Sequence, residues 1–255
     1  MRWREGGSGA GVVLFVHGFP FSGAVWDDQL AAVPEGWRFL APDLPGFGET
    51  PPVGGTLTMD RIADELAGFL AERQVRRAVV CGLSMGGYAS LALWRRHPAR
   101  VRALVLADTR AAADTPQARA GRYESAARAR SSGVRMVAEA MLPRLLSART
   151  RATRPDVVER LVGIMEAASV EGVAGALEGM AERPDSVPVL PTIDVPTLVL
   201  VGEADELTPP AESELLAARI PNAVLRLIPG AAHVTCMEAP ESFNADLQAF
   251  LGGLP

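Results

Sequence analysis

The sequence feature that constrains the fold most is the stretch from Val79 to Gly87, in which an apolar run leads into the pattern G-x-S-x-G. In this pattern a serine, here Ser84, occupies a tight turn between a buried strand and a helix, with its hydroxyl exposed. Glycine is expected at Gly82 and Gly86, because side chains there would collide with neighbouring backbone. The apolar run has the length of a strand, and the residues after the turn have helical spacing. The stretch therefore predicts a nucleophilic serine on a strand-turn-helix unit.

Strands and helices alternate on both sides of this unit and predict an α/β fold with a doubly wound, mostly parallel sheet. Several of the runs are continuously apolar, as expected for parallel strands that are buried on both faces. We expect strands at about 12–16, 38–41, 78–81, 101–107, 197–201 and 224–228. We expect helices at about 22–33, 58–72, 88–97, 210–220 and 240–251.

One segment interrupts the alternation and is expected to form a helical cap. From 111 to 186 the chain is rich in alanine and arginine. Its apolar spacing predicts helices at about 117–131, 133–142, 155–168 and 172–183. A chain of 255 residues has the length of one domain with an insertion. We therefore predict a core formed by residues 1–110 and 187–255, with the cap, residues 111–186, inserted between two strands.

The composition argues against several other classes of function. The net charge is −5 and no basic stripe occurs outside the cap, which argues against nucleic acid as a partner. No apolar run is long enough to span a bilayer, and the first residues lack the apolar centre of a secretory signal, so we expect a soluble, cytoplasmic protein. All 25 basic residues are arginine, which excludes a catalytic lysine. Cys81 and Cys236 have neither a disulfide-framework nor a metal-ligand spacing.

A serine hydroxyl needs a base within hydrogen-bond reach, and the sequence contains three histidines. His17 lies in a His-Gly turn, which we expect it to brace through hydrogen bonds. His97 ends a predicted helix on the far side from Ser84, where a cation at the helix C-terminus has a structural explanation. His233 follows a strand, at the carboxyl edge of the sheet where catalytic groups gather in open α/β proteins. Elimination and position together predict His233 as the base.

The base needs an acidic partner that fixes its tautomer and stabilises its cation. Asp205 follows a strand and precedes His233 by one helix and one strand, which makes it the preferred partner. Asp108, at the end of the preceding strand, is the alternative, because an acid there could also reach the histidine. Asp43 lies in a loop rich in proline and glycine, which we expect it to tie down.

The order Ser84, Asp205, His233, with the serine turn and the strand-helix alternation, resembles the α/β-hydrolase family. The motifs that carry this resemblance are HGFP at 17–20, DLPGFG at 43–48, GLSMG at 82–86, GEAD at 202–205 and the loop of His233. The resemblance covers essentially the whole chain. It is closest to small serine carboxylesterases, 3-oxoadipate enol-lactonases and cofactor-free haloperoxidase-like perhydrolases. It implies an oxyanion hole formed by the backbone N–H groups of Phe19 and Met85.

The cap is expected to roof the substrate pocket. We predict that Pro20, Met141, Leu142, Leu145 and Met165 line this pocket, although apolar residues at helical spacing are often simply core. Pro20 follows the predicted oxyanion residue and either shifts the donor geometry or only shapes a turn. The cap contains more arginines than acidic residues. It therefore either attracts esters or lactones that carry a carboxylate, or presents solvated arginine faces.

The resemblance implies a serine hydrolase that cleaves carboxylic esters of small to medium acyl chain through an acyl-serine intermediate. Hydrolysis of enol-lactones or other lactones, and perhydrolysis, are the enzymatic alternatives. A ligand receptor or signalling partner that retains the same three residues is the non-enzymatic alternative. The expected partner is a small-molecule ester or lactone, and the chemistry requires no metal ion or cofactor.

Overall fold

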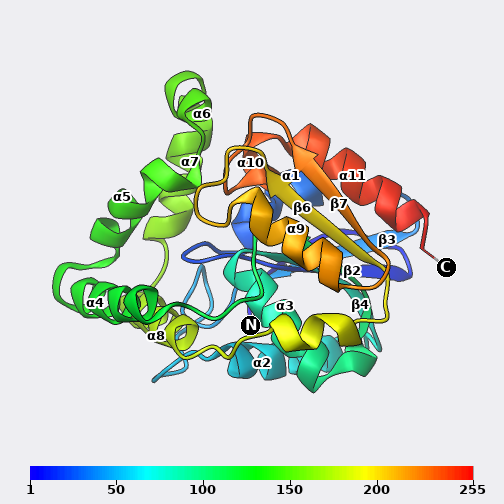
Figure 1. The fold of residues 1–255 in the computed structure, drawn as a ribbon, viewed down its shortest axis with the longest axis horizontal. Coiled ribbons are helices and arrows are strands. Elements are labelled where there is room, and N and C mark those ends of the chain that lie inside the picture. The colour runs from blue at the N-terminus through cyan, green and yellow to red at the C-terminus, as the bar shows by residue number, and fades with distance from the viewer. Residues whose placement is uncertain (255) are drawn as a thin grey trace.

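Residues 1–254, which the computed structural model describes, contain one central sheet of seven strands (Figure 1). The strands are, in chain order, β1 (Trp3–Gly7), β2 (Gly11–Val16), β3 (Trp37–Pro42), β4 (Ala78–Leu83), β5 (Val101–Ala107), β6 (Thr197–Gly202) and β7 (Ala223–Ile228). Their order across the sheet is β1-β3-β2-β4-β5-β6-β7. Every neighbouring pair is parallel except β1 with β3. This arrangement confirms the predicted doubly wound, mostly parallel sheet.

The edge strand β1 is the one strand that the sequence pattern does not predict. It pairs antiparallel with β3, with Glu5 opposite Leu40, and most of its residues are exposed. Backbone hydrogen bonds to β3 hold it in place rather than a buried apolar face. A strand of this kind carries no period-2 hydrophobic signal, which explains why sequence periodicity misses it.

Helices cover both faces of the sheet (Figure 1). The α-helices are α1 (Asp27–Leu30), α2 (Met59–Glu72), α3 (Met85–Arg96), α4 (Pro116–Ser132), α5 (Val134–Leu145), α6 (Ala148–Thr153), α7 (Pro155–Glu166), α8 (Val170–Ala181), α9 (Pro210–Arg219), α10 (Thr235–Glu238) and α11 (Pro240–Gly252). Three 3₁₀ turns join them: η1 (Gly23–Trp26), η2 (Pro98–Arg100) and η3 (Val187–Thr192). None of the helices in the described chain combines the length and apolarity needed to cross a bilayer.

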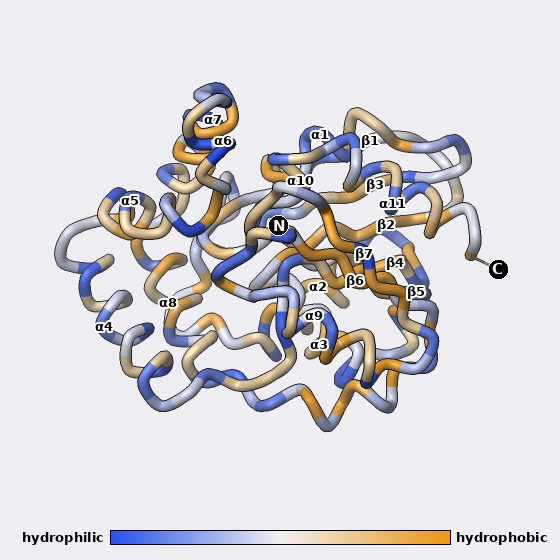
Figure 2. The backbone as a smooth tube through the Cα atoms, turned by 45° about the horizontal axis from the view of Figure 1, so that its top comes forward, coloured by the Kyte–Doolittle hydropathy of each residue, from blue (hydrophilic) through white to orange (hydrophobic). Residues whose placement is uncertain are grey.

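Alternate residues of each central strand point into two separate cores. In β2, Leu14 and Val16 pack in the core that also contains residues of α2, α3 and α9. Val13 and Phe15 pack in the opposite core, which contains residues of η1, α10 and α11. The hydrophobic parts of the backbone gather in these strands in Figure 2. The sheet therefore forms a rigid platform, and its carboxyl edge is available for a site.

The five helices from α4 to α8 lie between β5 and β6 in the chain and are called the inserted helices below. They form a separate group at one side of the sheet in Figure 1. The four helices expected in this segment are present as α4, α5, α7 and α8. The short helix α6 is additional, because its polar sequence has no apolar spacing that would indicate a helix.

The helix expected over residues 22–33 is shorter than the pattern predicts. The turn η1 begins the segment, and α1 ends at Leu30. The side chain of Ser22 accepts a hydrogen bond from Ala24 N at 3.3 Å, and Asp43 Oδ1 accepts one from Gly23 N at 2.7 Å. These contacts satisfy the first N–H groups of the segment and hold it in a 3₁₀ turn. One of them comes from a distant loop, which local spacing cannot reveal.

Candidate active site

Ser84 lies in the turn between β4 and α3, where the backbone has an unusual conformation. Its φ is 54° and its ψ is −113°, a region that residues with a side chain rarely adopt. Ser84 N donates to Ala107 O at 2.9 Å, and Thr109 Oγ1 donates to Ser84 O at 2.8 Å. These bonds to the end of β5 hold the strained residue in place, and its side chain faces a cavity.

Glycine is required on both sides of this turn. A Cβ atom at Gly82 would lie 2.3 Å from Gly86 O, and one at Gly86 would lie 2.0 Å from Val16 O. Both contacts are with backbone atoms, which cannot move aside without shifting the sheet or the helix. The close approach of α3 to β2 therefore explains the two glycines of the G-x-S-x-G pattern.

Three side chains from three different segments form a continuous series of hydrogen bonds. His233 Nε2 lies 2.8 Å from Ser84 Oγ, and His233 Nδ1 lies 2.8 Å from Asp205 Oδ2. Ser84 comes from the turn after β4, Asp205 from the loop after β6, and His233 from the loop after β7. An ionised Asp205 can only accept, so Nδ1 carries the proton and Nε2 accepts from the Ser84 hydroxyl. The structure thus brings the three predicted residues together.

Asp205 is held in its ionised form by the groups around it. Its Oδ1 accepts from Leu207 N at 2.8 Å and from Thr208 N at 3.0 Å, and its Oδ2 accepts from Thr208 Oγ1 at 2.8 Å. Burial alone favours the protonated acid. However, the charge of His233 and the hydrogen bonds from His233 and Thr208 outweigh burial, and the pKa of Asp205 lies below its ordinary value.

Asp108, the alternative acid, lies between the same two loops but makes no hydrogen bond with His233. Its Oδ1 accepts from Gly202 N at 2.9 Å, and its Oδ2 lies 2.5 Å from Thr235 Oγ1. Burial, together with the negative charge of Asp205, raises the pKa of Asp108 well above its ordinary value. Asp108 therefore links the end of β6 to the start of α10 and braces the two loops from behind.

The other two histidines lie away from Ser84 Oγ in structural roles. His17 is fully buried; its Nδ1 lies 2.9 Å from Gly18 O, and its Nε2 accepts from Leu44 N at 3.0 Å. Burial lowers the pKa of His17 to about 4, so the ring is neutral at pH 7 and braces the turn. His97 Nε2 lies 2.7 Å from Asp64 Oδ1 on the outer surface.

Asp43 and the two cysteines also have structural roles. Asp43 accepts hydrogen bonds from Gly23 N and from Glu49 N, and so ties down its loop. Cys81 and Cys236 are buried, and burial followed by the charge of Asp108 raises the pKa of both thiols. Across residues 1–254, no three or more His, Cys, Asp or Glu side chains are grouped so that they could hold a metal ion.

Two backbone N–H groups beside Ser84 donate to no acceptor among the described residues. They belong to Phe19 and Met85. Met85 is the first residue of α3, at the end of the helix that carries partial positive charge. The turn before Phe19 lies close to the serine, because a Cβ atom at Gly18 would be 3.2 Å from Ser84 Cβ. The peptide bond between Phe19 and Pro20 is cis.

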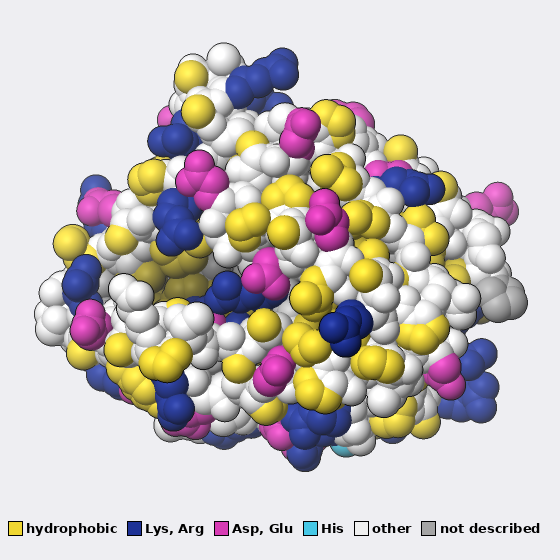
Figure 3. Space-filling model, in the orientation of Figure 1, with side chains coloured by type: hydrophobic (Ala, Val, Ile, Leu, Met, Phe, Trp, Pro, Cys, Tyr) yellow, Lys and Arg dark blue, Asp and Glu magenta, His cyan; other side chains and the backbone are white. Residues whose placement is uncertain are grey.

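A cavity of about 420 Å³ opens at Ser84 and His233, between the inserted helices and the edge of the sheet. Figure 3 shows a hollow on this side of the molecule, with hydrophobic side chains inside it and both basic and acidic side chains at its margin. The residues that line the cavity are Phe19, Ser84, Tyr88, Arg110, Ala118, Gly121, Arg122, Ser125, Met141, Arg144, Leu177, Met180, Leu207, Thr208 and His233. Its walls are thus partly apolar and partly cationic.

Of the five residues that sequence analysis predicts for the pocket, Met141 lines this cavity. Leu145 and Met165 are fully buried in a core beneath the inserted helices, and Pro20 and Leu142 are not among the lining residues either. Apolar spacing shows that a helix has a buried face but does not show what that face packs against. Arg110, Arg122 and Arg144 also line the cavity. The sequence shows only that this part of the chain has an excess of positive charge and does not show which arginines face the cavity.

Glu238 attaches the His233 loop to the inserted helices, and no sequence signal points to it. Its Oε1 accepts from Ala232 N at 2.7 Å, and its Oε2 accepts from Ser147 N at 2.9 Å. Beside it, His233 N donates to Leu145 O at 3.2 Å. One carboxylate therefore bridges the residue before His233 and the segment that follows α5.

The substitution Glu238→Gln is expected to lower the free energy of unfolding by about 1–3 kcal/mol, because a glutamine amide can accept only one of the two N–H bonds. The measurement is urea denaturation followed by circular dichroism. Glu241→Gln, the same change at an exposed position near the start of α11, is the matched control and should leave stability nearly unchanged. Equal unfolding midpoints for the two variants would contradict the bridging role of Glu238.

Comparisons with known proteins relate the whole chain to one family. The sequence profile of the α/β-hydrolase fold matches residues 11–240. An esterase from Thermogutta terrifontis, solved with malate bound, is 40% identical with a TM-score of 0.96, over 99% of this chain and 93% of that chain. An enol-lactonase from Burkholderia xenovorans LB400 is 28% identical with a TM-score of 0.92, over 98% and 96% of the two chains. A pimeloyl-[acyl-carrier protein] methyl ester esterase from Neisseria meningitidis serogroup C is 30% identical over 253 residues, 95% of this chain and 94% of that protein.

Proposed function

The chain belongs to the α/β-hydrolase fold family, and we propose that it is a serine hydrolase that cleaves carboxylic esters of small to medium acyl chain. The observation that carries this proposal is the continuous hydrogen bonding of Asp205, His233 and Ser84 at the wall of an open cavity. The esterases and the enol-lactonase among its relatives support the same class of bond, since a lactone is an internal ester.

In the first half-reaction, His233 acts as the general base. Its Nδ1–H donates to Asp205, so Nε2 is free to take the Ser84 proton while Oγ attacks the ester carbonyl carbon. The ionised Asp205 stabilises the imidazolium that forms. The imidazolium then gives its proton to the oxygen of the leaving alcohol, the C–O bond breaks, and the acyl group remains on Ser84.

The negative charge that develops on the carbonyl oxygen needs donors that are already in place. The unpaired N–H groups of Phe19 and Met85 are suited to this role, and removing one such donor typically raises the barrier by about 2.7–4 kcal/mol. The N-terminal end of α3 adds favourable partial charge. In the second half-reaction His233 deprotonates a water molecule, which attacks the acyl carbon. The imidazolium then returns the proton to Ser84 Oγ as the acyl C–O bond breaks, which releases the acid and restores the serine hydroxyl.

Hydrolysis of lactones is the second candidate function, favoured by the likeness to the enol-lactonase at 28% identity. The same groups would act on a cyclic substrate, whose leaving alcohol stays attached to the acyl group. In perhydrolysis, hydrogen peroxide would replace water in the second half-reaction and release a peracid. A ligand receptor that retains the three residues would bind such molecules without turnover.

The proposal is tested by a panel of p-nitrophenyl esters and by an activity probe. We expect turnover of the acetate and butyrate esters, and weaker turnover of the decanoate, because a cavity of about 420 Å³ limits the acyl chain. A fluorophosphonate should form one adduct, located by mass spectrometry on the peptide that contains Ser84. Lactones and peracid formation are assayed in parallel. No turnover in any assay, together with no adduct on Ser84, would rule out the enzyme and favour the receptor.

A further inference from the structure

The charge of the cavity wall is strongly one-sided. Arg110, Arg122 and Arg144 line the cavity that contains Ser84, and among the described lining residues there is no aspartate or glutamate. The three arginines come from three separate segments: the loop after β5, helix α4 and helix α5. Guanidinium groups that line one cavity repel each other unless an anion offsets them. Solvated arginine faces on the cap would point outward instead.

One buried carboxylate offsets part of this charge. Asp114 has a side chain that is 1% exposed, and it pairs with Arg110 Nη2 at 3.0 Å, with Arg183 Nη2 at 2.9 Å and with Arg122 Nε. Burial favours the protonated acid, but the hydrogen bond from Arg122 and the charges of the three arginines outweigh it, and the pKa of Asp114 lies below its ordinary value. Asp114 is therefore an anion that three cations share.

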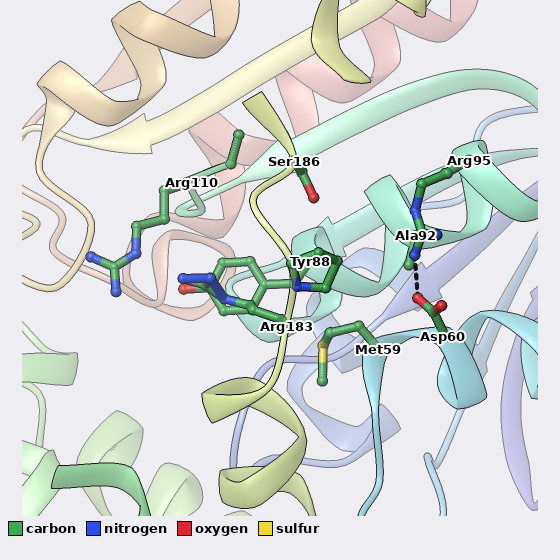
Figure 4. A pocket seen from close by; sticks show the side chains of 10 residues that line it. Met59, Asp60, Tyr88, Ala92, Arg95, Arg110, Arg183 and Ser186 are labelled. Carbon is green, nitrogen blue, oxygen red and sulfur yellow. Dashed lines mark hydrogen bonds and ion pairs between the residues drawn. The ribbon is translucent and has the colours of Figure 1, made fainter. Parts of the chain in front are cut away.

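Arg183 shows that the offset is incomplete. It stacks on the ring of Tyr88 at 4.2 Å and is 7% exposed (Figure 4). Burial first, and then the charges of Arg110 and Arg122, lower the pKa of Arg183 in spite of Asp114. Its Nε and Nη1, together with Arg110 Nε, are buried donors without an acceptor among residues 1–254. Glu212 acts on Arg110 through its charge but lies beyond ion-pair distance.

The unpaired Nε and Nη1 atoms of Arg183 are buried, and Arg183 does not line the cavity that contains Ser84. The small cavity beside Arg183 and Tyr88 in Figure 4 has a volume of about 10 Å³, room for one water molecule and too little for a carboxylate. Tyr88 and Arg110 also line the large cavity, together with Arg122. An anion inside the cavity of Ser84 therefore meets Arg110 and Arg122, and Arg183 acts on it only through Asp114, the carboxylate that it shares with them.

We propose that Arg110, Arg122 and Arg144 form a subsite for a carboxylate on the substrate, so that the preferred substrates are esters or lactones that carry a free carboxylate in addition to the scissile bond. This inference rests on the proposed ester hydrolysis. Arg110 and Arg122, already fixed by Asp114, would hold the carboxylate through charge-assisted hydrogen bonds. Arg144 is exposed, lines the same cavity and makes no ion pair within the described chain; its Nη2 donates to Glu206 O at 3.4 Å.

The test compares substrates that differ only in the second carboxylate. Monomethyl adipate is paired with methyl hexanoate, which places the carboxylate on the acyl side. The second pair, 4-acetoxybutanoate and butyl acetate, places it on the alcohol side. For at least one pair we expect kcat/KM to be about ten- to a hundredfold higher for the anionic member, the range given by one or two charge-assisted hydrogen bonds. Whichever pair shows the preference identifies the side that faces the arginines.

Arginine variants separate a subsite from general attraction of anions. Arg110→Gln and Arg144→Gln should each reduce the preference, measured as the ratio of kcat/KM for the anionic and the neutral member of a pair, at least several-fold. Arg144→Gln is the safer variant for folding, because it breaks no ion pair. Arg128→Gln removes the same charge from an exposed position on α4 that does not line the cavity, and it should keep the preference.

Adipate binding, measured by calorimetry on the wild-type protein, gives a readout that does not need turnover. We expect binding that weakens about tenfold or more in Arg110→Gln and is unchanged in Arg128→Gln. Equal kcat/KM within both substrate pairs, or an equal effect of Arg128→Gln and Arg144→Gln, would overturn the subsite and leave ester hydrolysis standing. If no ester is hydrolysed, the proposed function fails. The subsite is then judged by adipate binding, which supports it if binding weakens in Arg110→Gln and overturns it if binding is unchanged.

Discussion

Replacing Ser84 with alanine is expected to lower kcat for hydrolysis of p-nitrophenyl butyrate by about 10⁶-fold, the loss typical when the nucleophile of a serine hydrolase is removed. Ser84 Oγ is the only side-chain oxygen that hydrogen-bonds His233 Nε2 among the described residues. Without it, His233 has no nucleophile to activate, and the two N–H groups beside it act only on a bound substrate. The measurement is initial rates over a range of substrate concentrations, with the fluorophosphonate adduct as a second readout.

Ser125→Ala provides the matched control for this change. Ser125 lines the same cavity, but its Oγ donates to Gly121 O within α4 and does not contact His233. We expect this variant to keep nearly the full rate and to form the adduct as before. Hydrolysis in Ser84→Ala at a rate close to that of Ser125→Ala would show that another group attacks the ester.

Replacing Asp205 with asparagine is expected to lower kcat by about 10⁴-fold, because the amide would favour the wrong tautomer of the histidine. An asparagine NH₂ facing His233 Nδ1 would require Nδ1 to accept, which places the ring proton on Nε2. Nε2 could then no longer take the proton of Ser84. The fold should survive, because the amide oxygen can still accept from Leu207 N and Thr208 N.

Asp108→Asn is the comparison that makes the previous result decisive. Burial raises the pKa of Asp108 well above its ordinary value and so favours an uncharged side chain, and an uncharged asparagine of the same shape replaces it closely. We expect less than about a tenfold loss of kcat, since no proton of the reaction passes through this group. If Asp108→Asn lowered kcat more than Asp205→Asn, the acidic partner of His233 would be Asp108, at the end of β5.

The local sequence pattern predicts most strands of the sheet and the three residues Ser84, Asp205 and His233, and the reasons are physical. The strands β2, β4, β5 and β6 are buried on both faces, so each is a continuous apolar run. A parallel sheet brings the carboxyl ends of its strands to one edge, so residues just after β4, β6 and β7 must lie near each other. Chain order alone therefore predicts that Ser84, Asp205 and His233 meet.

The local sequence pattern cannot predict features that depend on packing between distant segments. The edge strand β1 has no apolar face, and the 3₁₀ turn at Gly23 depends on the carboxylate of Asp43. Leu145 and Met165 fit the spacing of a pocket wall equally well, yet they pack into the core. Arg110 and Arg122 are held in place by one buried residue, Asp114, and nothing in the sequence distinguishes it from the other acids of the cap.

The bridge formed by Glu238 limits how far the inserted helices can be exchanged by protein engineering. The serine turn is anchored to the sheet through β5, whereas the His233 loop is anchored partly to Leu145 O and Ser147 N at the end of α5. A grafted insertion that lacks an equivalent carbonyl and N–H would release the base and leave the nucleophile in place. The inserted helices therefore cannot be exchanged to change the substrate range without affecting the position of His233 relative to Ser84. A directed-evolution library across 116–181 retains alignment when residues 145–147 are kept constant.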